Sequence, residues 1–326
     1  VLYLEDVMGA ISWNASRDLF VRVAAGFVVV FTLRTFAKPK NRPTSGTRNN
    51  GQTRHANPFL QSYTENELEA VERRTNAYLS DMYGNTMQLY DSLVSCTDKG
   101  HGHPTACPVN EPTGPHVQYS LVQPTIECQN QAHYGSSVGD GRKSICSPEK
   151  LQEGCIIYSL GSRNDFSFED DVLEKTPCTV HTFDCTINRP SGEMRPRLHF
   201  HDWCIAGSTT SNGRYFTIPQ IMSKLGHTRV NLMKMDIEGY EQGVFAGWQS
   251  SDALPDQLLV EIHGCNPPVR GKYRHLALAE MQLMVAKLLF VGYRIAVVDP
   301  QQGCSNCIEA TLLLVGQYNH PAYIDV

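Results

Sequence analysis

The sequence predicts an α/β fold built on a mostly parallel, seven-stranded sheet, preceded by an extension of helix and loop. The first indication is an apolar run, 155–160, that leads into a glycine turn, and a second run, 179–183, that ends on Asp184. Three further apolar runs also end in polar, titratable residues. The last indication is a closing pair of runs near 293–298 and 310–315. Five parallel strands followed by a hairpin account for this order.

Composition limits the classes of protein to be considered. The chain has 326 residues, of which 41% are hydrophobic and 19% charged, enough for one good-sized core with additional segments. Its net charge is −5 and it has no long basic run, so we expect no general nucleic-acid binding. Its 11 cysteines indicate an oxidising compartment, and their odd number implies a thiol that is free or paired with another chain.

Residues 1–58 are predicted to form an anchor-like apolar segment and a flexible linker. Residues 19–36 are mostly apolar but contain Arg22 and Arg34, and the uncharged centre is too short to cross a bilayer unless both arginines reach the headgroups. A single-pass membrane anchor, a signal-peptide core and a buried helix are all open interpretations. The first is favoured, which implies the secretory pathway. Basic residues after the run favour a cytosolic domain whereas the cysteines favour the lumen, so the side of the membrane stays open.

Residues 59–150 are predicted to be a helix followed by a cysteine-bearing loop. Thr64 and Glu67 have the spacing of a capping box, and apolar residues then recur at helical intervals. From 96 to 146 we expect a loop tied by disulfides. His101 and His103 lie near its cysteines, but their spacing matches no standard zinc pattern, and a disulfide-tied loop is favoured over a metal centre.

Residues 151–326 are predicted to form the main α/β domain, and its first part has the order of a nucleotide-binding half. A strand, a glycine turn, a helix and a second strand ending in an acid are typical of that unit. In such a unit Gly161 lets the backbone approach a ligand, and Asp184 accepts hydrogen bonds from two ribose hydroxyls. An ordinary turn without a ligand is the alternative, because one glycine stands where a dinucleotide site has three.

The later strands bring more carboxylates to the same edge of the predicted sheet. The run 197–203 ends on Asp202 and Trp203, and after a helix at 218–225 the run 230–235 leads into three carboxylates within residues 236–241. The run 258–263 ends on a histidine, and a helix from about 275 to 289 follows. Such a cluster is costly without a use, and ligands bind at the carboxyl edge of open sheets.

Several of these blocks resemble one family of enzymes. Residues 232–241 are similar to the LKxDxEGxE signature of FkbM-type methyltransferases, and 259–263 are similar to the strand that follows it. Residues 159–169, 178–184 and Cys304 to Cys307 with Glu309 resemble the animal methyltransferase-like proteins. The resemblance covers about residues 150–326. It implies a class I methyltransferase (Rossmann-like) fold that binds S-adenosylmethionine (SAM).

The resemblance also implies a role for each block in binding the cofactor. The loop of Gly161, Ser162 and Asn164 passes beneath the methionine part, Asp184 holds the ribose hydroxyls, and the adenine lies beside a pair of residues, Asp202 and Trp203. The sequence departs from the usual pattern in two respects. Gly161 stands alone where many methyltransferases have two or three glycines, and Ser159 stands where an acid is common.

The candidates for chemistry lie on the fourth and fifth strands. Asp236, Glu238 and His263 are the candidate catalytic residues for removing a proton from a hydroxyl acceptor, and only His263 has a reference pKa near neutrality. A purely structural histidine is an equally good interpretation. Asp236 with Glu261 is a weaker candidate for a divalent-ion site, and no metal is our favoured expectation. Glu241 fits a carboxylate at a helix start, and Cys304 with Cys307 fits a structural pair.

We therefore expect an SAM-dependent methyltransferase, with O-methyl transfer to an unidentified acceptor. The alternative, suggested by the single glycine, is a methyltransferase fold that has lost catalysis and serves as an interaction module. An NAD-dependent dehydrogenase is disfavoured because the sequence lacks GxGxxG.

Overall fold

A computed structural model describes residues 57–98, 122–136, 141–187, 195–208, 213–250, 252–263, 274–299 and 307–316, without the side chains of 83–98, 274–281 and 283. All of them belong to one compact unit, residues 53–319. The predictions made for residues 19–36, for His101 and His103, and for Cys304 lie outside the described residues.

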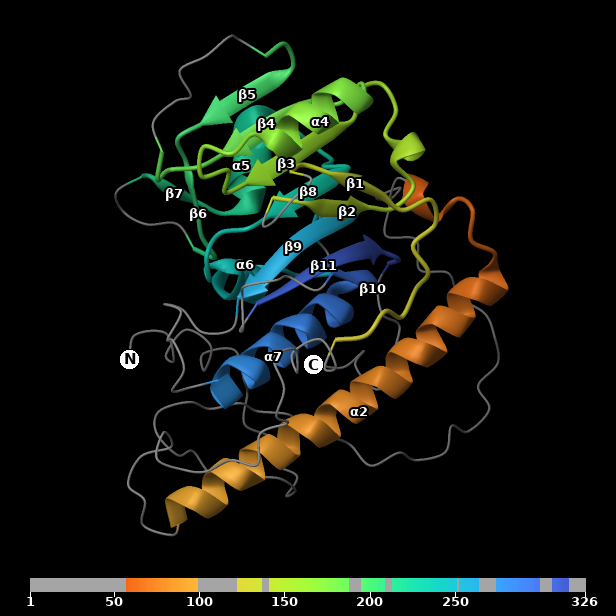
Figure 1. Cartoon of the computed structure of the whole chain (residues 1–326), viewed down its shortest axis with the longest axis vertical. Helices are drawn as coiled ribbons and strands as arrows, with labels where there is room; N and C mark the ends of the chain where they lie inside the picture. The colour runs from red at the N-terminus through yellow and green to blue at the C-terminus, as the bar shows by residue number, and fades with distance from the viewer. Residues whose placement is uncertain are drawn as a thin grey trace. The chain divides into compact units, whose positions relative to one another are not determined.

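The main sheet has seven strands in the order β10-β11-β9-β8-β3-β4-β5 (Figure 1). The five strands from β9 to β5 are parallel, and β11 is antiparallel to both of its neighbours, β9 and β10. This is the class I methyltransferase topology, so the predicted fold class is confirmed. The strands are β3 Ile156–Leu160, β4 Thr179–Phe183, β5 Leu198–His201, β8 Leu232–Met235, β9 Gln257–His263, β10 Tyr293–Asp299 and β11 Cys307–Leu314.

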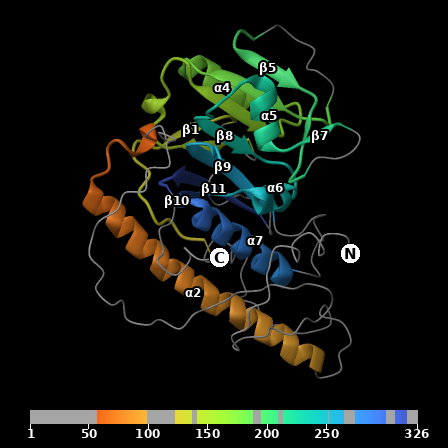
Figure 2. The ribbon, with the colours of Figure 1, turned by 180° about the vertical axis from the view of Figure 1, so that it is seen from behind.

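Alternating residues of the strands build a separate apolar core on each face of the sheet. On one face Tyr158 and Met233 pack with α5 (Ile218–Leu225), α6 (Glu241–Gly247) and α7 (Arg274–Val291). On the other face Ile157 and Leu232 pack with α4 (Ser167–Lys175) and with Ile145. Figures 1 and 2 show α4 and α5 on opposite sides of the sheet. Because side chains along a strand point to opposite faces, the apolar runs have to be continuous to fill both cores.

The N-terminal extension is more ordered than the sequence predicted. Its helix α2, Glu65–Asp98, begins at the predicted capping box, in which the Thr64 backbone N–H donates to Glu67 at 2.6 Å. The prediction of a loop from 96 to 146 is wrong at both ends. The helix continues to Asp98, and two short strands, β1 Ala132–Tyr134 and β2 Lys143–Ile145, pair antiparallel. Strands of three residues are too short to show an alternating pattern.

Disulfides tie consecutive segments together within the described residues. Cys128 pairs with Cys146 in the segment where a disulfide-tied loop was expected, and this expectation is confirmed. Two more bonds join Cys155 with Cys178 and Cys185 with Cys204. The sequence separations are 18, 23 and 19, and closing loops of this size stabilises a fold by roughly 3 kcal/mol each. Cys307 is disulfide-bonded as well.

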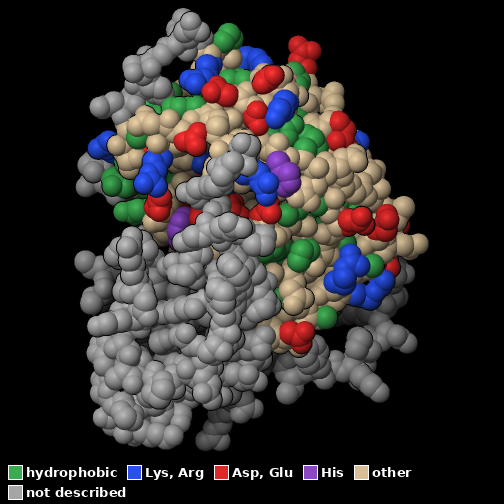
Figure 3. All heavy atoms as spheres, in the orientation of Figure 1, with side chains coloured by type: hydrophobic (Ala, Val, Ile, Leu, Met, Phe, Trp, Pro, Cys, Tyr) green, Lys and Arg blue, Asp and Glu red, His purple; other side chains and the backbone are tan. Residues whose placement is uncertain are grey.

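The remaining elements are short, and the charges on the visible surface are mixed. The 3-10 turns Pro58–Leu60 and Pro148–Lys150 and the pair β6 Cys204–Ile205 with β7 Tyr215–Phe216 complete the described elements. In Figure 3, acidic and basic side chains are interspersed over the described part of the face shown. Among the helices that the structure describes, none is both long and apolar enough to span a membrane.

Candidate functional site

The glycine bend after β3 lies between the ends of the two neighbouring strands. Gly161 has φ of +78°, and a Cβ at this position would lie 1.8 Å from the backbone oxygen of Asp236. Its N–H donates to the Phe183 carbonyl at 2.9 Å, and its own carbonyl accepts a hydrogen bond from Lys234 Nζ. Only glycine fits here, because any side chain would collide with the backbone that follows β8.

Asp184, directly after β4, closes on this bend. Its Oδ2 accepts hydrogen bonds from the backbone N–H groups of Ser162 at 3.0 Å and Arg163 at 2.8 Å. Its Oδ1 accepts from the N–H of Thr186 at 2.9 Å and from its hydroxyl at 2.6 Å. Burial alone would raise the pKa of Asp184, but the hydrogen bonds from Thr186, Arg163 and Ser162 hold it below its ordinary value. The carboxylate is therefore ionised at neutral pH.

The loop residues predicted to bind the cofactor differ in exposure. Ser162 is buried under Asp184, whereas Arg163 and Asn164 are exposed and have φ of 49° and 65°, in the left-handed region. Asp202 is exposed just past β5. Trp203 is half-buried in an aromatic group, with ring centroids 4.7 Å from His201 and 5.2 Å from Phe216. The loop and Asp184 are thus in contact, and Asp202 and Trp203 follow the adjacent strand.

A second group of carboxylates lies after β8 and on β9 and β11. Single oxygens of Asp236, Glu261 and Glu309 all lie within 4.8 Å of one another. The ammonium group of Lys143, from β2, lies 3.5 Å from Asp236 and 3.9 Å from Glu261, and it donates a hydrogen bond to Glu309. Burial opposes the charge on Lys143, but the three carboxylates raise its pKa above the ordinary value.

The carboxylates of this group differ in their ionisation. Burial tends to raise the pKa of Asp236, but the charges of Lys143, Lys234 and His263 lower it below its ordinary value. Burial, with the charges of Asp236 and Glu309, raises the pKa of Glu261 to about 9. Burial and the neighbouring charges therefore shift the pKa values of Asp236 and Glu261 in opposite directions.

His263 lies beside this group, at the end of β9. Its Nδ1 is 3.3 Å from the buried Glu241, and its Nε2 is 3.7 Å from Glu261 and 3.8 Å from the exposed Glu238. Burial tends to lower the pKa of His263, but the contact with Glu241 and the nearby acids raise it to about 9. The reference pKa near neutrality does not hold for His263 in this fold, because the imidazole is surrounded by acids.

Glu241 itself stabilises the turn after β8. It is the first residue of α6, as expected for a helix-start carboxylate. Its Oε1 accepts hydrogen bonds from the N–H groups of Ile237 at 3.0 Å and Gly239 at 3.3 Å. Side-chain atoms of Glu261, His263 and Cys307 also lie within 4.8 Å of one another, but the sulfur of Cys307 is in a disulfide and is not free to bind a metal.

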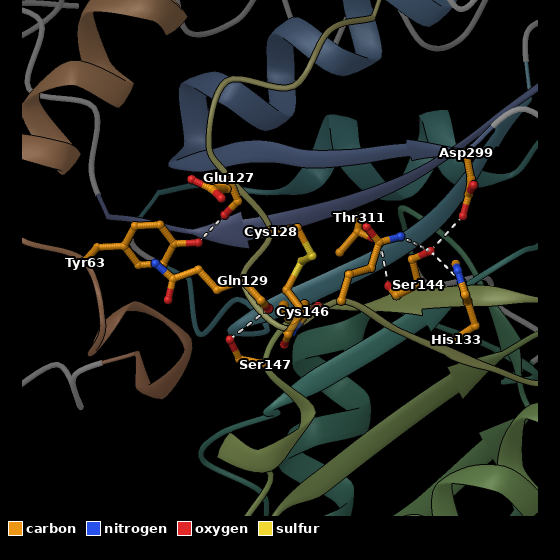
Figure 4. The surroundings of a disulfide bond; sticks show 12 residues. Tyr63, Glu127, Cys128, Gln129, His133, Ser144, Cys146, Ser147, Asp299 and Thr311 are labelled. Atoms are coloured by element: carbon orange, nitrogen blue, oxygen red, sulfur yellow. Dashed lines mark hydrogen bonds between the residues drawn. A yellow bond between two sulfur atoms is a disulfide. The ribbon is translucent and has the colours of Figure 1, made fainter.

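The two residues Ser144 and Cys146, on the C-terminal side of Lys143, are fixed to the main sheet, and Figure 4 shows the contacts of Ser144. The Ser144 hydroxyl, which lies near His133, donates to Asp299 of β10 at 2.7 Å, and Thr311 of β11 donates to the Ser144 carbonyl at 2.6 Å. The Gln257 side chain of β9 makes hydrogen bonds to both backbone groups of Cys146, at 2.8 and 3.0 Å. A strand tied to three others holds the lysine rigidly.

Sequence reasoning missed Lys143 because it lies in a segment taken for loop, far along the chain from its partners. Lys234, buried at the foot of the glycine bend, was also missed. A signal for it was present: it is the one charged residue within an otherwise apolar strand, LMKM.

Comparison with known proteins now identifies the family. A family model described as "Methyltransferase domain" matches residues 53–287. The chain belongs to this methyltransferase-domain family. The match begins in the N-terminal extension, and the predicted domain boundary at residue 150 stays a prediction.

The relatives of this methyltransferase-domain chain are distant. It is 29% identical over 121 residues to probable methyltransferase-like protein 24 of Rattus norvegicus and 28% identical to that of Homo sapiens, and the match covers 33% of this chain in each case. The matched part is about a third of the length of these relatives. Among solved structures, a fibrillarin pre-rRNA processing protein of Methanococcus jannaschii is 9% identical, with a TM-score of 0.34 over 64% of this chain and 87% of that one. An Aeropyrum pernix fibrillarin solved with bound SAM is 13% identical, with a TM-score of 0.30 over 50% of this chain and 68% of that one.

Proposed function

We propose that this chain binds SAM and transfers its methyl group to an oxygen atom of an acceptor. The observation that carries the proposal is the bend at Gly161, which lies between a carboxylate at the end of β4 and another at the end of β8. SAM supplies a methyl group on a sulfonium, a good leaving group. The protein has to orient the acceptor and exclude water.

The residues at the bend fit an adenosyl group if a ribose hydroxyl replaces one of the present hydrogen-bond donors of Asp184. The missing side chain at Gly161 makes room for the Asp236 carbonyl, so the bend and the end of β8 lie against each other. A carboxylate has about four acceptor positions, and Asp184 uses them on Ser162, Arg163 and Thr186. Thr186 is an exposed residue, and its hydroxyl is the partner that a ribose hydroxyl can replace at least cost. Asn164, Asp202 and Trp203 flank the same end of the sheet and complete the proposed cofactor site.

At the transfer end, Asp236 is the ionised side chain that accepts a hydrogen bond from the acceptor. Its pKa is lowered by Lys143 and Lys234, so it orients a hydroxyl group better than it removes a proton. His263 accepts a proton only after losing its own. We therefore expect transfer to become faster as the pH rises toward 9, with exposed Glu238 contributing charge beside the imidazole.

Calorimetric titration with SAM and with S-adenosylhomocysteine tests the cofactor. We expect binding of one molecule of either compound per chain, and at least about tenfold weaker binding by Asp184→Ala. A folded wild-type chain that binds neither compound contradicts the proposal. The acceptor class is then sought by mass spectrometry of extracts incubated with methyl-labelled SAM, comparing the wild type with Asp236→Asn.

One observation favours a second candidate function, that of an inactive fold serving as an interaction module. The chain itself fills the acceptor positions of Asp184, so the bend is stable without a ligand. The module would keep its cellular role after both Asp184→Ala and Asp236→Ala. Loss of that role with either variant would favour the enzyme.

We also propose that the chain works in the secretory pathway or outside the cell, with residues 19–36 as a membrane anchor. The disulfides support this proposal, because such bonds persist in oxidising compartments. Alkylation of the chain in intact cells, followed by mass spectrometry, tests it. Cys155 and Cys178 should be protected, and alkylation at both would contradict the location.

A further inference from the structure

Lys143 is buried among three carboxylates, and the proposed methyl transfer does not by itself require a buried lysine there. Its side chain is 1% exposed, although a buried ammonium group is costly unless it is well paired. It comes from β2, which is outside the seven-stranded sheet. Its partners lie on three separate strands or strand ends of that sheet, at positions 236, 261 and 309.

The three carboxylates have the spacing of ligands around one cation. Oxygens of Asp236, Glu261 and Glu309 within 4.8 Å of one another can all reach a single divalent ion, whose oxygen ligands lie at about 2.0–2.6 Å. The register explains the convergence: Glu261 pairs with Glu309 across β9 and β11, and Asp236 follows the residue that pairs with Val260. Paired residues point to the same face, so the acids gather there.

The ammonium group is held at this place by the rest of its strand. Ser144 is bonded to Asp299 and Thr311, and Cys146 is bonded to Gln257. These bonds fix the backbone directly after Lys143, from which the side chain extends to the three carboxylates. The cation is thus part of the fold and does not depend on the supply of an ion.

We propose that Lys143 is a positioning residue whose ammonium group takes the place of a divalent cation among Asp236, Glu261 and Glu309. Removing the ammonium group while keeping the carboxylates turns the cluster into a site for Mn²⁺ or Ca²⁺, ions that take oxygen ligands. For methyl transfer, which rests on the proposed function, the consequence is that the chain provides its own cation to fix Asp236.

The test compares Mn²⁺ binding by three proteins: the wild type, Lys143→Ala and a matched control, Lys175→Ala. Binding is measured by electron paramagnetic resonance, as the decrease in the signal of free Mn²⁺. Lys175 is a partly exposed lysine of α4 paired with Asp171. We expect Lys143→Ala to bind one Mn²⁺ at least about tenfold more tightly than the other two. At about 100 times its Kd, the ion should raise the melting temperature of Lys143→Ala by about 5–10 °C and leave the wild type unchanged.

Further variants locate the ion. Adding Glu261→Gln to Lys143→Ala should weaken Mn²⁺ binding about tenfold or more, and Lys143→Arg, which keeps the charge, should bind no more Mn²⁺ than the wild type. Folded Lys143→Ala without Mn²⁺ binding, or equal binding by the wild type, overturns the proposal. If Lys143→Ala folds only with Mn²⁺ present, that result supports it.

If Lys143→Ala does not fold under any condition, the proposal is tested with the double variant that carries Lys143→Gln and Glu309→Gln. It removes one charge of each sign and leaves two carboxylates. Because one ligand is lost, binding should be weaker than at three carboxylates: Mn²⁺ binding tighter than that of the wild type supports the proposal, and binding no tighter than that of the wild type overturns it. Since these measurements use no SAM, their failure leaves the methyltransferase proposal standing, and failure of SAM binding leaves this one standing.

Discussion

The two acids beside the glycine bend are satisfied in different ways. Asp184 takes its hydrogen bonds from Ser162, Arg163 and Thr186, all within 22 residues of it and most of them backbone N–H groups. Asp236 is paired with the ammonium group of Lys143, which lies 93 residues away and is buried. The partners of Asp184 are therefore close to it in the sequence, whereas the partner of Asp236 comes from the distant strand β2.

Because of this difference, Asp184 can exchange one hydrogen-bond donor for another, whereas Asp236 cannot exchange its buried ammonium partner. A neutral donor at an exposed residue, such as the hydroxyl of Thr186, can be replaced by the hydroxyl group of a ligand with little change in free energy. A buried ammonium group among carboxylates cannot leave without exposing uncompensated charge. We infer that the Asp184 side adapts to a ligand and the Asp236 side is preorganised.

The largest effect should come from removing the distant cation. Lys143→Met should lower the free energy of unfolding by about 3–5 kcal/mol, because it leaves three carboxylates without their buried partner. Lys175→Met, the control at the surface, should change it by less than about 0.5 kcal/mol. Denaturant unfolding measures both. Equal losses in the two variants would show that the preorganised site does not exist.

The next effect should come from the local site. Asp184→Ala leaves the N–H groups of Ser162 and Arg163 without an acceptor and should cost about 2–3 kcal/mol of unfolding free energy. Asp202→Ala, at an exposed acid past the next strand, should cost less than about 0.5 kcal/mol. Calorimetric unfolding compares them. A neutral Asp184→Ala would mean that the loop is not held by this carboxylate.

A smaller effect should come from filling the bend between the two acids. Gly161→Ala places a Cβ against the Asp236 carbonyl, whereas Gly154→Ala has a similar φ of +82° but nothing within 4 Å. The first should therefore be less stable than the second by about 1–3 kcal/mol. The two melting temperatures, with the disulfides intact, give this difference. Identical values would show that the strand ends separate easily.

The last effect depends on pH. The pKa of His263 is about 9 in the folded chain, above its ordinary value of 6.5, so its contribution to stability is fully present below about pH 6.5 and is lost as the pH rises through 9. Melting temperatures of the wild type and His263→Gln should converge over this range. Over the same range the proposed SAM-dependent transfer should become faster. Parallel stability profiles for the two proteins would contradict the assigned pKa.

Much of the fold was predictable because each piece of it is encoded locally. The apolar runs before Gly161, Asp184 and Asp236 each had to fill two cores, and they became β3, β4 and β8. The capping box at Thr64 gave the start of α2. Strands β1 and β2 were not predictable, because three residues carry too little pattern and their stability comes from contacts with β9, β10 and β11.

The sequence by itself determined which acids stand at strand ends and that one glycine lies between them, since both follow from the order of residues along the chain. Only the tertiary structure decided what surrounds those acids. Lys143 meets Glu309 across 166 residues, and His263 acquires a pKa of about 9 from Glu241 and Glu261. The physical reason is that ionisation depends on burial and on charges within a few ångströms, and these distances exist only after the strands have come together.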